Sequence, residues 1–186
     1  MSEWIAELTR ALEQEYGADR PRVCTLATVD KAGLPRARSV VCRRVGPDGA
    51  IWVASDARSE KNEQVKANPQ AEVVFWLPTR REQFRVQGSV KLVGEAARDP
   101  ARADLWCELS DEARALFFWP APGAKKLDAP ESFPKSVDAE RPLPANFEVL
   151  VLRPRRVEHL QLKPHPHRRR RWMLAGHWNS ASDVNP

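Results

Sequence analysis

The sequence has few cysteines and no long apolar segment. The three cysteines, Cys24, Cys42 and Cys107, are odd in number and widely spaced, so they indicate neither a disulfide framework nor a zinc ribbon. No run of eighteen apolar residues occurs. The N-terminal stretch MSEWIAELTRALEQEYG carries acidic residues where a signal peptide would need a basic start. We therefore expect a cytoplasmic protein with reduced cysteines.

Excess positive charge is also missing from most of the chain. Residues 153–172 contain eight basic residues and one acid, Glu158, for a net charge of +7; the whole chain carries +5, so the remainder carries −2. A protein that binds a long polyanion usually spreads its positive charge along a face or groove. The confined excess therefore favours a local site for an anion or a phosphate group.

The length and composition are those of one globular domain, and we treat residues 1–186 as a single unit. Its 186 residues are 42% hydrophobic and 30% charged. Residues 1–17 have apolar positions at helical spacing, including Trp4, Leu8 and Leu12, and end at Gly17. This segment predicts an amphipathic helix that covers an edge of the fold.

The rest of the chain reads mainly as β-structure. Three strands in meander order are predicted over 22–29, 36–45 and 50–55. The nearly continuous apolar run 71–77 predicts a strand buried on both faces, and 83–93 alternates between apolar and polar residues. A last β-segment covers 146–163. Helices are expected at 60–67 and from residues 99 and 110, and the proline-rich segment 120–144 is expected to be a mobile loop or lid. This order favours a closed or partly closed antiparallel barrel with peripheral helices.

Two segments have the composition of an anion site. In RARSVVCRR, strand alternation places Arg36, Arg38 and Arg44 on one face and Arg43 on the other. In residues 58–61, a hydroxyl, the free N–H groups of a helix start and a lysine could converge on one phosphate. For the arginines taken alone, solvated charge at a strand edge is the simpler interpretation, because surface arginine is common.

Taken in order, these segments resemble the pyridoxamine 5'-phosphate oxidase family. The resemblance runs through RSVVCRR, IWVASDARSEKNEQVKANP, VVFWLPTRREQFRVQG and RVEHLQLKPHPHRRRRW, and covers about residues 20–186. It is nearest to a divergent bacterial FMN-binding branch of the family. It implies an FMN-binding antiparallel split β-barrel, mainly β (α+β), and a homodimer with FMN at the subunit interface.

The resemblance implies which residues bind the FMN phosphate. Arg38 matches the arginine that grips the phosphate, and Ser59 and Lys61 match members of a Ser-Arg-Lys turn. The middle position of that turn is Glu60 in this chain, a departure that would require Arg58 to reach in instead. An arginine fork and a lysine point charge are both suited to a phosphate dianion.

Further positions are implied for the flavin ring. On the phosphate-binding strand and the next one they are Val40, Val41, Arg43, Val53 and Ala54. Later in the chain they are Gln83, Leu160, which replaces a tryptophan of the family, and Arg169, with a register uncertainty of one residue that would give the role to Arg170.

The implied substrate residues are Arg43, Arg114, His165 and His167. His165 stands where the family has an arginine, and the family's clamp positions fall at Trp106, Ser110 and Arg114, so the match is incomplete. We therefore predict an FMN-dependent oxidoreductase that acts on a small reduced substrate, with the flavin reoxidised by an acceptor such as dioxygen. The alternative is a true pyridoxamine/pyridoxine 5'-phosphate oxidase that makes pyridoxal 5'-phosphate.

The C-terminal residues are also compatible in part with a metal site or a nucleic-acid-binding site. All four histidines lie in the last 28 residues, but His165 and His167 stand beside four arginines, which would repel a metal dication, so no metal is predicted. The RRRRW run could contact nucleic-acid phosphates with an aromatic residue stacking beside it. This nucleic-acid-binding module is the less favoured alternative, because no other part of the chain supplies a basic face.

Overall fold

The structure is a computed structural model that describes residues 2–18, 20–97 and 99–186. Its helices are α1 (Glu3–Tyr16), α2 (Glu60–Ala67), α3 (Pro100–Glu108) and α4 (Asp111–Ala115). Its strands are β1 (Arg22–Val29), β2 (Pro35–Val45), β3 (Ile51–Asp56), β4 (Gln70–Leu77), β5 (Glu82–Val93), β6 (Phe147–Gln161), β7 (Arg168–Ala175), β8 (His177–Trp178) and β9 (Ser182–Val184). Among these described residues, none of the helices is long and apolar enough to cross a membrane.

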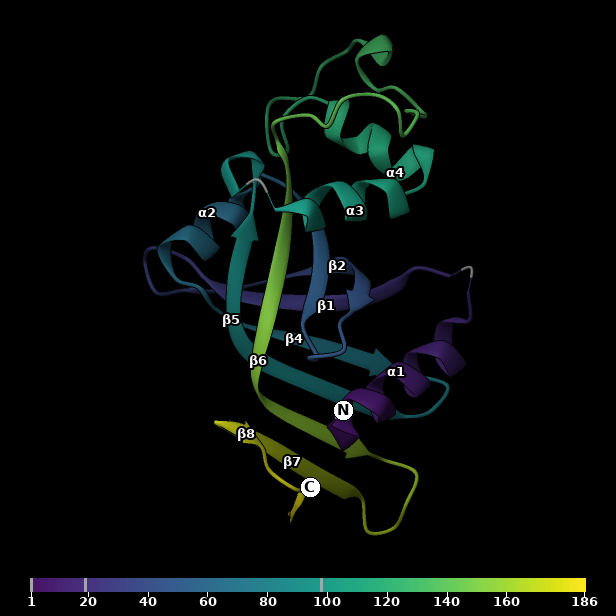
Figure 1. Cartoon of the computed structure of the whole chain (residues 1–186), viewed down its shortest axis with the longest axis vertical. Helices are drawn as coiled ribbons and strands as arrows, with labels where there is room; N and C mark the ends of the chain where they lie inside the picture. Colours follow the sequence, from purple (N-terminus) through teal and green to yellow (C-terminus); the bar gives the residue numbers. More distant parts are fainter. Residues whose placement is uncertain (1, 19, 98) are drawn as a thin grey trace.

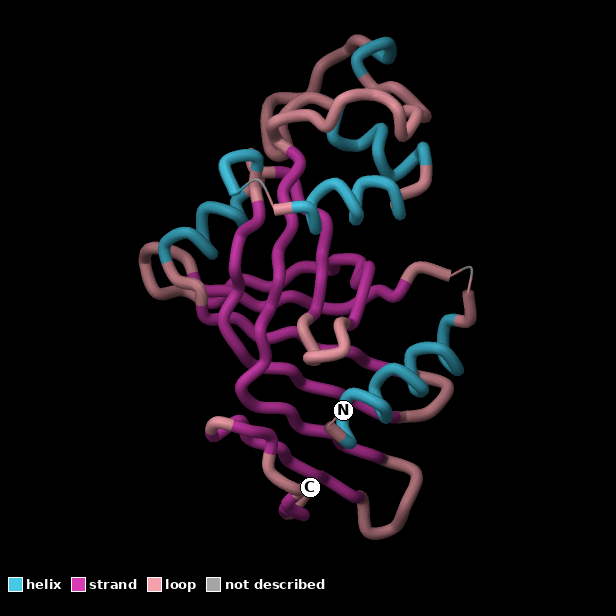
Figure 2. Tube along the Cα trace, in the orientation of Figure 1, coloured by secondary structure: helices cyan, strands magenta, loops and turns pink. Residues whose placement is uncertain are grey.

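The strands form an antiparallel barrel. Neighbouring strands follow the order β3-β2-β1-β4-β5-β6, and β3 also pairs with β6, which closes the ring. The first half of β6, residues 147–152, pairs with β3, and the second half, residues 156–161, pairs with β7. Strands occupy the middle of the molecule and helices lie around them (Figure 2). This architecture confirms the predicted split barrel with peripheral helices.

A bend in β5 and β6 allows β6 to pair with β3 along its first half and with β7 along its second half. The pairing of these strands shifts register between Gln87 and Gly88. A Cβ atom at position 88 would lie 2.0 Å from the carbonyl oxygen of Arg153, so the close approach of the two backbones requires glycine. Beyond the bend, β6, β7 and β8 extend past the barrel at the end opposite α3 and α4 (Figure 1).

Two apolar clusters hold these parts together. The main core fills the barrel and extends under α1, with Trp4, Phe75 and Trp172 fully buried. A second cluster lies under α3 and α4, where the ring of Trp106 packs edge-on against Phe147 with centroids 5.0 Å apart. Burial of such aromatic side chains contributes about 2 kcal/mol each.

Most of the predicted segments are present, one prediction is wrong, and three strands, β7, β8 and β9, were not predicted. Helix α2 and strand β1 have the predicted bounds. Strand β4 is not buried on both faces: its residues alternate, and Trp76 is 46% exposed. A continuous apolar run does not specify two buried faces, because an apolar side chain can also face an open sheet surface. The longest of the added strands is β7, which runs through the four arginines.

The proline-rich segment 120–144 lies over α3 and α4 (Figure 1). The N–H of Val137 donates to the carbonyl of Asp111 at 3.0 Å, and the indole of Trp119 donates to the carbonyl of Pro134 at 2.9 Å. One short 3-10 helix, Pro130–Ser132, is its regular element. The predicted mobility of this segment stays a prediction.

Candidate functional site

Arg38 lies on β2, with its guanidinium held by neutral groups. It donates to the carbonyl of Leu26 at 3.1 Å, to the hydroxyl of Thr28 at 2.6 Å and to the amide oxygen of Gln64 at 2.6 Å. Among the described residues, no carboxylate forms an ion pair with it. Its side chain is therefore fixed in place while its positive charge is left for another partner.

Lys61 lies in the first turn of α2 and is held in the same way. Ser59, the N-cap of that helix, is 7% exposed and accepts a hydrogen bond from Nζ of Lys61 at 2.8 Å. Burial lowers the pKa of Lys61, the charge of Asp56 opposes this, and the positive charge of nearby Arg38 lowers the pKa further. The two cations are thus close enough to repel each other, and an anion between them would relieve that repulsion.

Arg58 is engaged elsewhere. Its Nη2 lies 2.6 Å from Oδ2 of Asp56, and Nη2 also donates to the carbonyl of Trp119 at 2.9 Å. Burial alone would raise the pKa of Asp56, but hydrogen bonds from Arg58 and Asn146 outweigh burial and lower it. In this structure Arg58 does not join Arg38 and Lys61, so its predicted reach toward the phosphate stays a prediction.

Farther along β2, Val41 and Arg43 line a cavity of about 510 Å³. Other residues that line it include Arg20, Arg22, Ser110 and one carboxylate, Glu108, which pairs with Arg44. The buried Nε of Arg43 has no hydrogen-bond partner among the described residues, and burial lowers the pKa of this arginine. The cavity therefore offers positive charge to a small anionic group.

The other predicted ring-lining residues lie in less accessible positions. Val40 packs against the main core, and Val53 is 3% exposed inside that core. Ala54 is half-buried against the second cluster. Their side chains shape the barrel wall beside β2.

Gln83, Leu160 and Arg169 form one row across three strands. Gln83 of β5 is directly opposite Leu160 of β6, and Leu160 is directly opposite Arg169 of β7. The three line a hollow of about 130 Å³ together with Arg85 and Glu158. Sequence positions up to 86 residues apart are thus brought side by side by strand register.

The register also places Arg169 and Arg170, the two candidates for the FMN-contacting arginine, on opposite faces of β7. Arg170 faces the opposite side of β7, where it donates to Glu3 at 2.9 Å and forms an ion pair with Glu7, both on α1. Its side chain is 9% exposed. Arg169, on the side of Gln83 and Leu160, is the residue that shares their hollow.

The structure does not bring the predicted substrate residues together. Arg114 is 4% exposed, and its guanidinium donates to the carbonyls of Val137 at 2.9 Å and Trp106 at 3.2 Å and pairs with Asp111. His165 and His167 are exposed in the connection between β6 and β7, at the opposite end of the molecule (Figure 1). Arg114 thus secures the proline-rich segment, and its predicted substrate role has no support from these contacts.

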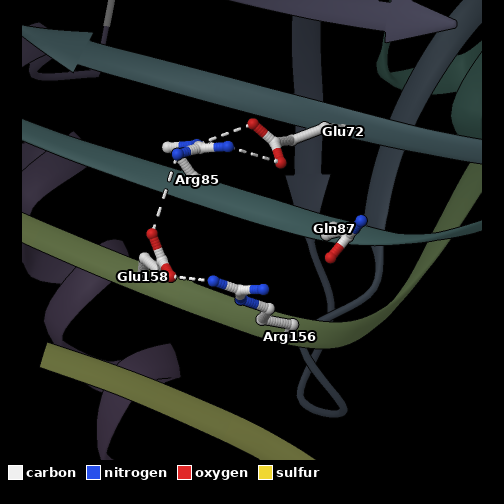
Figure 3. A pocket seen from close by; sticks show the side chains of 5 residues that line it. All are labelled: Glu72, Arg85, Gln87, Arg156 and Glu158. Carbon is white, nitrogen blue, oxygen red and sulfur yellow. Dashed lines mark hydrogen bonds and ion pairs between the residues drawn. The ribbon is translucent and has the colours of Figure 1, made fainter.

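Glu158 is the main residue that sequence reasoning missed. It is 4% exposed, and burial alone would raise its pKa, but hydrogen bonds from Arg156, Arg169 and Arg171 lower it to about 2. Figure 3 shows it between Arg156 and Arg85, which also binds Glu72. A signal was available, because Glu158 is the one acid among eight basic residues in 153–172.

Thr28 and Gln64 were missed as well. Both hold the guanidinium of Arg38, and their side chains also bond to each other at 2.7 Å. A phosphate site needs such supporting acceptors to fix the arginine before the anion arrives. Neither residue has a pattern in the sequence that marks it.

These features fit a flavin mononucleotide. The phosphate dianion needs neutralising charge, which Arg38 and Lys61 retain, and the ring needs an apolar wall, which the valines of β2 supply. The separate hollow lined by Gln83 has hydrogen-bonding groups of the kind that the polar edge of the ring needs.

Comparisons with known proteins point to the same cofactor. Residues 1–94 match the family described as pyridoxamine 5'-phosphate oxidase, FMN-binding domain. A pyridoxine/pyridoxamine 5'-phosphate oxidase of Rhodococcus jostii is 31% identical over 167 residues, covering 85% of this chain and 73% of that protein. One of Arabidopsis thaliana is 28% identical over 166 residues, covering 86% and 83%.

Two solved structures share the fold. A pyridoxamine 5'-phosphate oxidase-related, FMN-binding protein of Nostoc punctiforme has a TM-score of 0.91 and 33% identity, covering 100% of this chain and 99% of that one. PhzG of Burkholderia lata, in complex with tetrahydrophenazine-1-carboxylic acid, has a TM-score of 0.82 and 19% identity, covering 100% and 94%. The predicted resemblance and the predicted cofactor are confirmed: the chain belongs to the pyridoxamine 5'-phosphate oxidase family, and its cofactor is FMN.

Proposed function

We propose that this protein is an FMN-dependent oxidoreductase that oxidises a small reduced substrate, with the FMN phosphate bound by Arg38, Ser59 and Lys61. The observation that carries the proposal is the pair of neighbouring cations whose hydrogen-bond partners are all neutral. A phosphate dianion would match both charges, and the free N–H groups at the start of α2 would add donors. The relatives named as oxidases support the reaction class.

Bound FMN supplies the redox chemistry, by accepting a hydride equivalent and passing the electrons to an acceptor such as dioxygen. The chain's part is to bind and orient. Arg38 and Lys61 would fix one end of the cofactor, and the backbone of β2 at Val40 and Val41 would lie along the ring. Arg43, farther along the strand, would face the substrate from the cavity that it lines. The barrel wall, with Val53 in its core, would keep water from one side of the ring.

The substrate class follows from the same cavity. Arg43 and Arg22 have no ion-pair partner among the described residues, and both line it. Two guanidinium groups on one cavity favour a substrate with a carboxylate or phosphate group. The alternative, that pyridoxamine or pyridoxine 5'-phosphate is the substrate, has the names of the relatives in its favour. Against it stand the buried contacts of Arg114 and the replacement of an arginine by His165.

A homodimer with FMN at the subunit interface would complete the site. The row of Gln83, Leu160 and Arg169 lies on an open face of β4 to β7 that also carries Trp76 and Met173, which are 46% and 41% exposed. Large apolar side chains on an open sheet face are typical of a contact surface. Pairing of two copies would place this row of one copy over the phosphate-binding residues of the other.

The proposal also includes a single domain over residues 1–186 and a cytoplasmic location.

Replacement of Arg38 tests the proposal. We expect Arg38→Ala to weaken FMN binding to the apoprotein by about tenfold or more, because a charge-assisted contact to the phosphate is lost. Flavin fluorescence in an FMN titration measures the affinity. Arg36→Ala is the matched control, since Arg36 is two residues earlier on the same strand and pairs with Asp30 at 2.8 Å. Equal affinities for the two variants would contradict the assignment.

Turnover separates the two substrate classes. The proposal expects pyridoxamine 5'-phosphate to reduce the bound flavin more slowly than the best of a panel of small reduced carboxylates or phosphates. Efficient formation of pyridoxal 5'-phosphate with stoichiometric hydrogen peroxide would instead establish the alternative.

A further inference from the structure

One buried carboxylate lies at the centre of four arginines on the open face of β5, β6 and β7. Oε1 of Glu158 accepts from Nε of Arg171 at 2.8 Å and from Arg156, and Oε2 accepts from Arg169 and lies 3.7 Å from Nη1 of Arg85. Each oxygen of the carboxylate thus serves two guanidinium groups. Figure 3 shows two of these contacts, those to Arg85 and Arg156.

The charge on this face depends on Glu158. The second carboxylate on the face, Glu72, binds Arg85 through two hydrogen bonds of 2.7 and 3.2 Å. On this face, among the described residues, the carboxylate that pairs with Arg169 and Arg171 is Glu158. Without its charge, they and Arg156 would repel one another at short range.

The register shows how Glu158 acts on Arg169 in particular. Arg171 is directly opposite Glu158, whereas Arg169 is directly opposite Leu160, two residues farther along β6. An arginine beside an apolar leucine has no local acceptor, so its guanidinium reaches diagonally along the face to Glu158. The position of that guanidinium in the hollow with Gln83 is therefore set by the carboxylate.

We propose that Glu158 is the positioning residue that holds Arg169 in the orientation in which it contacts FMN. This inference rests on the proposed function, in which Arg169 is an FMN ligand. Glu158 itself makes no contact with the cofactor in this account. It acts through Arg169, by fixing one side of the guanidinium and leaving the remaining N–H groups free for the flavin.

A double-mutant cycle on FMN affinity tests the inference. Glu158→Gln and Glu158→Asp are each made in the natural chain and in Arg169→Met, and FMN is titrated into the four apoproteins and their two parents. Gln removes the charge, and Asp keeps it but withdraws it by one methylene. We expect Gln to weaken FMN binding about tenfold and Asp several-fold in the natural chain, and neither to weaken it further in Arg169→Met.

Glu72→Gln is the matched control. It removes a carboxylate from the same face and frees Arg85, but Glu72 does not contact Arg169. We expect it to change FMN affinity less than about twofold. Circular dichroism establishes that each variant is folded, and Glu158→Asp decides the test if Glu158→Gln is not.

The outcomes separate the inference from the function on which it rests. Equal weakening by the Glu158 variants in both backgrounds would overturn the inference, because Glu158 would then act on the fold and not through Arg169. Unchanged affinity in both Glu158 variants of the natural chain would overturn it as well. If Arg169→Met itself leaves FMN affinity unchanged, Arg169 is not a ligand and the inference falls, while Arg38→Ala still reports on the phosphate site independently.

Discussion

Two regions of this chain are rich in positive charge, and they treat that charge in opposite ways. In the first region, Arg38 of β2 and Lys61 of α2 are held by hydroxyl, carbonyl and amide oxygens. On β7, each member of the arginine run pairs with a carboxylate: Arg168 with Asp183, Arg169 and Arg171 with Glu158, and Arg170 with Glu3 and Glu7.

The difference separates positive charge that remains available to a ligand from positive charge that is neutralised within the protein. Neutral acceptors orient a cation without cancelling its charge, so the Arg38–Lys61 pair stays available to an anion. Carboxylates cancel the arginine charges, so most of the run joins β7 to β6 and to α1. The arginine run, which is the most conspicuous feature of the sequence, is therefore mainly structural, and the Arg38–Lys61 pair is the one we propose for the phosphate.

On β7, where carboxylates pair with the arginines, removal of the Glu158 carboxylate has the largest expected effect on stability. We expect Glu158→Gln to lower the free energy of unfolding by about 2 kcal/mol, because partly exposed arginines lose the buried carboxylate that they share. Denaturant unfolding near neutral pH measures it. Glu72→Gln, whose carboxylate is more exposed and serves Arg85 alone, is the control and should cost less than about 1 kcal/mol.

The same residue predicts how stability depends on pH. The folded-state pKa of Glu158, about 2, is below its ordinary value of 4.5, so its contribution is complete above the ordinary value and is lost as pH falls toward 2. The natural chain should therefore lose more stability across this range than Glu158→Gln. Parallel slopes for the two proteins would show that the arginines do not depend on Glu158.

At Arg38 and Lys61, which pair with no described carboxylate, the expected effect of pH is smaller and concerns FMN affinity. The lowered pKa of Lys61 means that the apoprotein loses this charge at a lower pH than an ordinary lysine does. FMN affinity should then decline as pH rises through that pKa, by less than about tenfold. Lys61→Arg keeps the charge and should remove the decline, while any titration of the flavin itself remains in both proteins. An identical decline in the variant would exclude Lys61 as its source.

Local patterns predicted much of the fold. Helix α1 follows from apolar residues at helical spacing, and α2 follows from Ser59 as an N-cap and from Pro69 after its end. Strand β7 could not be predicted in this way, because four consecutive arginines have no apolar alternation. Its two faces are defined only by pairing with β6, which brings Glu158 beside Arg171.

The candidate site could be predicted only in part, for a related reason. Arg38 and Lys61 stand in short motifs that the family resemblance identifies, and the positive charge of Arg38 contributes to the lowered pKa of Lys61. The partners of an arginine are set by tertiary contacts that no motif contains. Arg114 shows this most clearly: its guanidinium binds the carbonyl of Val137, 23 residues away in a segment without regular pairing.

FMN and riboflavin differ only in the phosphate, so the ratio of their affinities reports on the phosphate site alone. We expect the natural apoprotein to bind FMN at least about 100-fold more tightly than riboflavin, through two charge-assisted contacts. In the double variant Arg38→Ala/Lys61→Ala the two affinities should become nearly equal, with riboflavin affinity unchanged. A strong preference for FMN that survives in the double variant would contradict the account, because the phosphate would then be bound elsewhere.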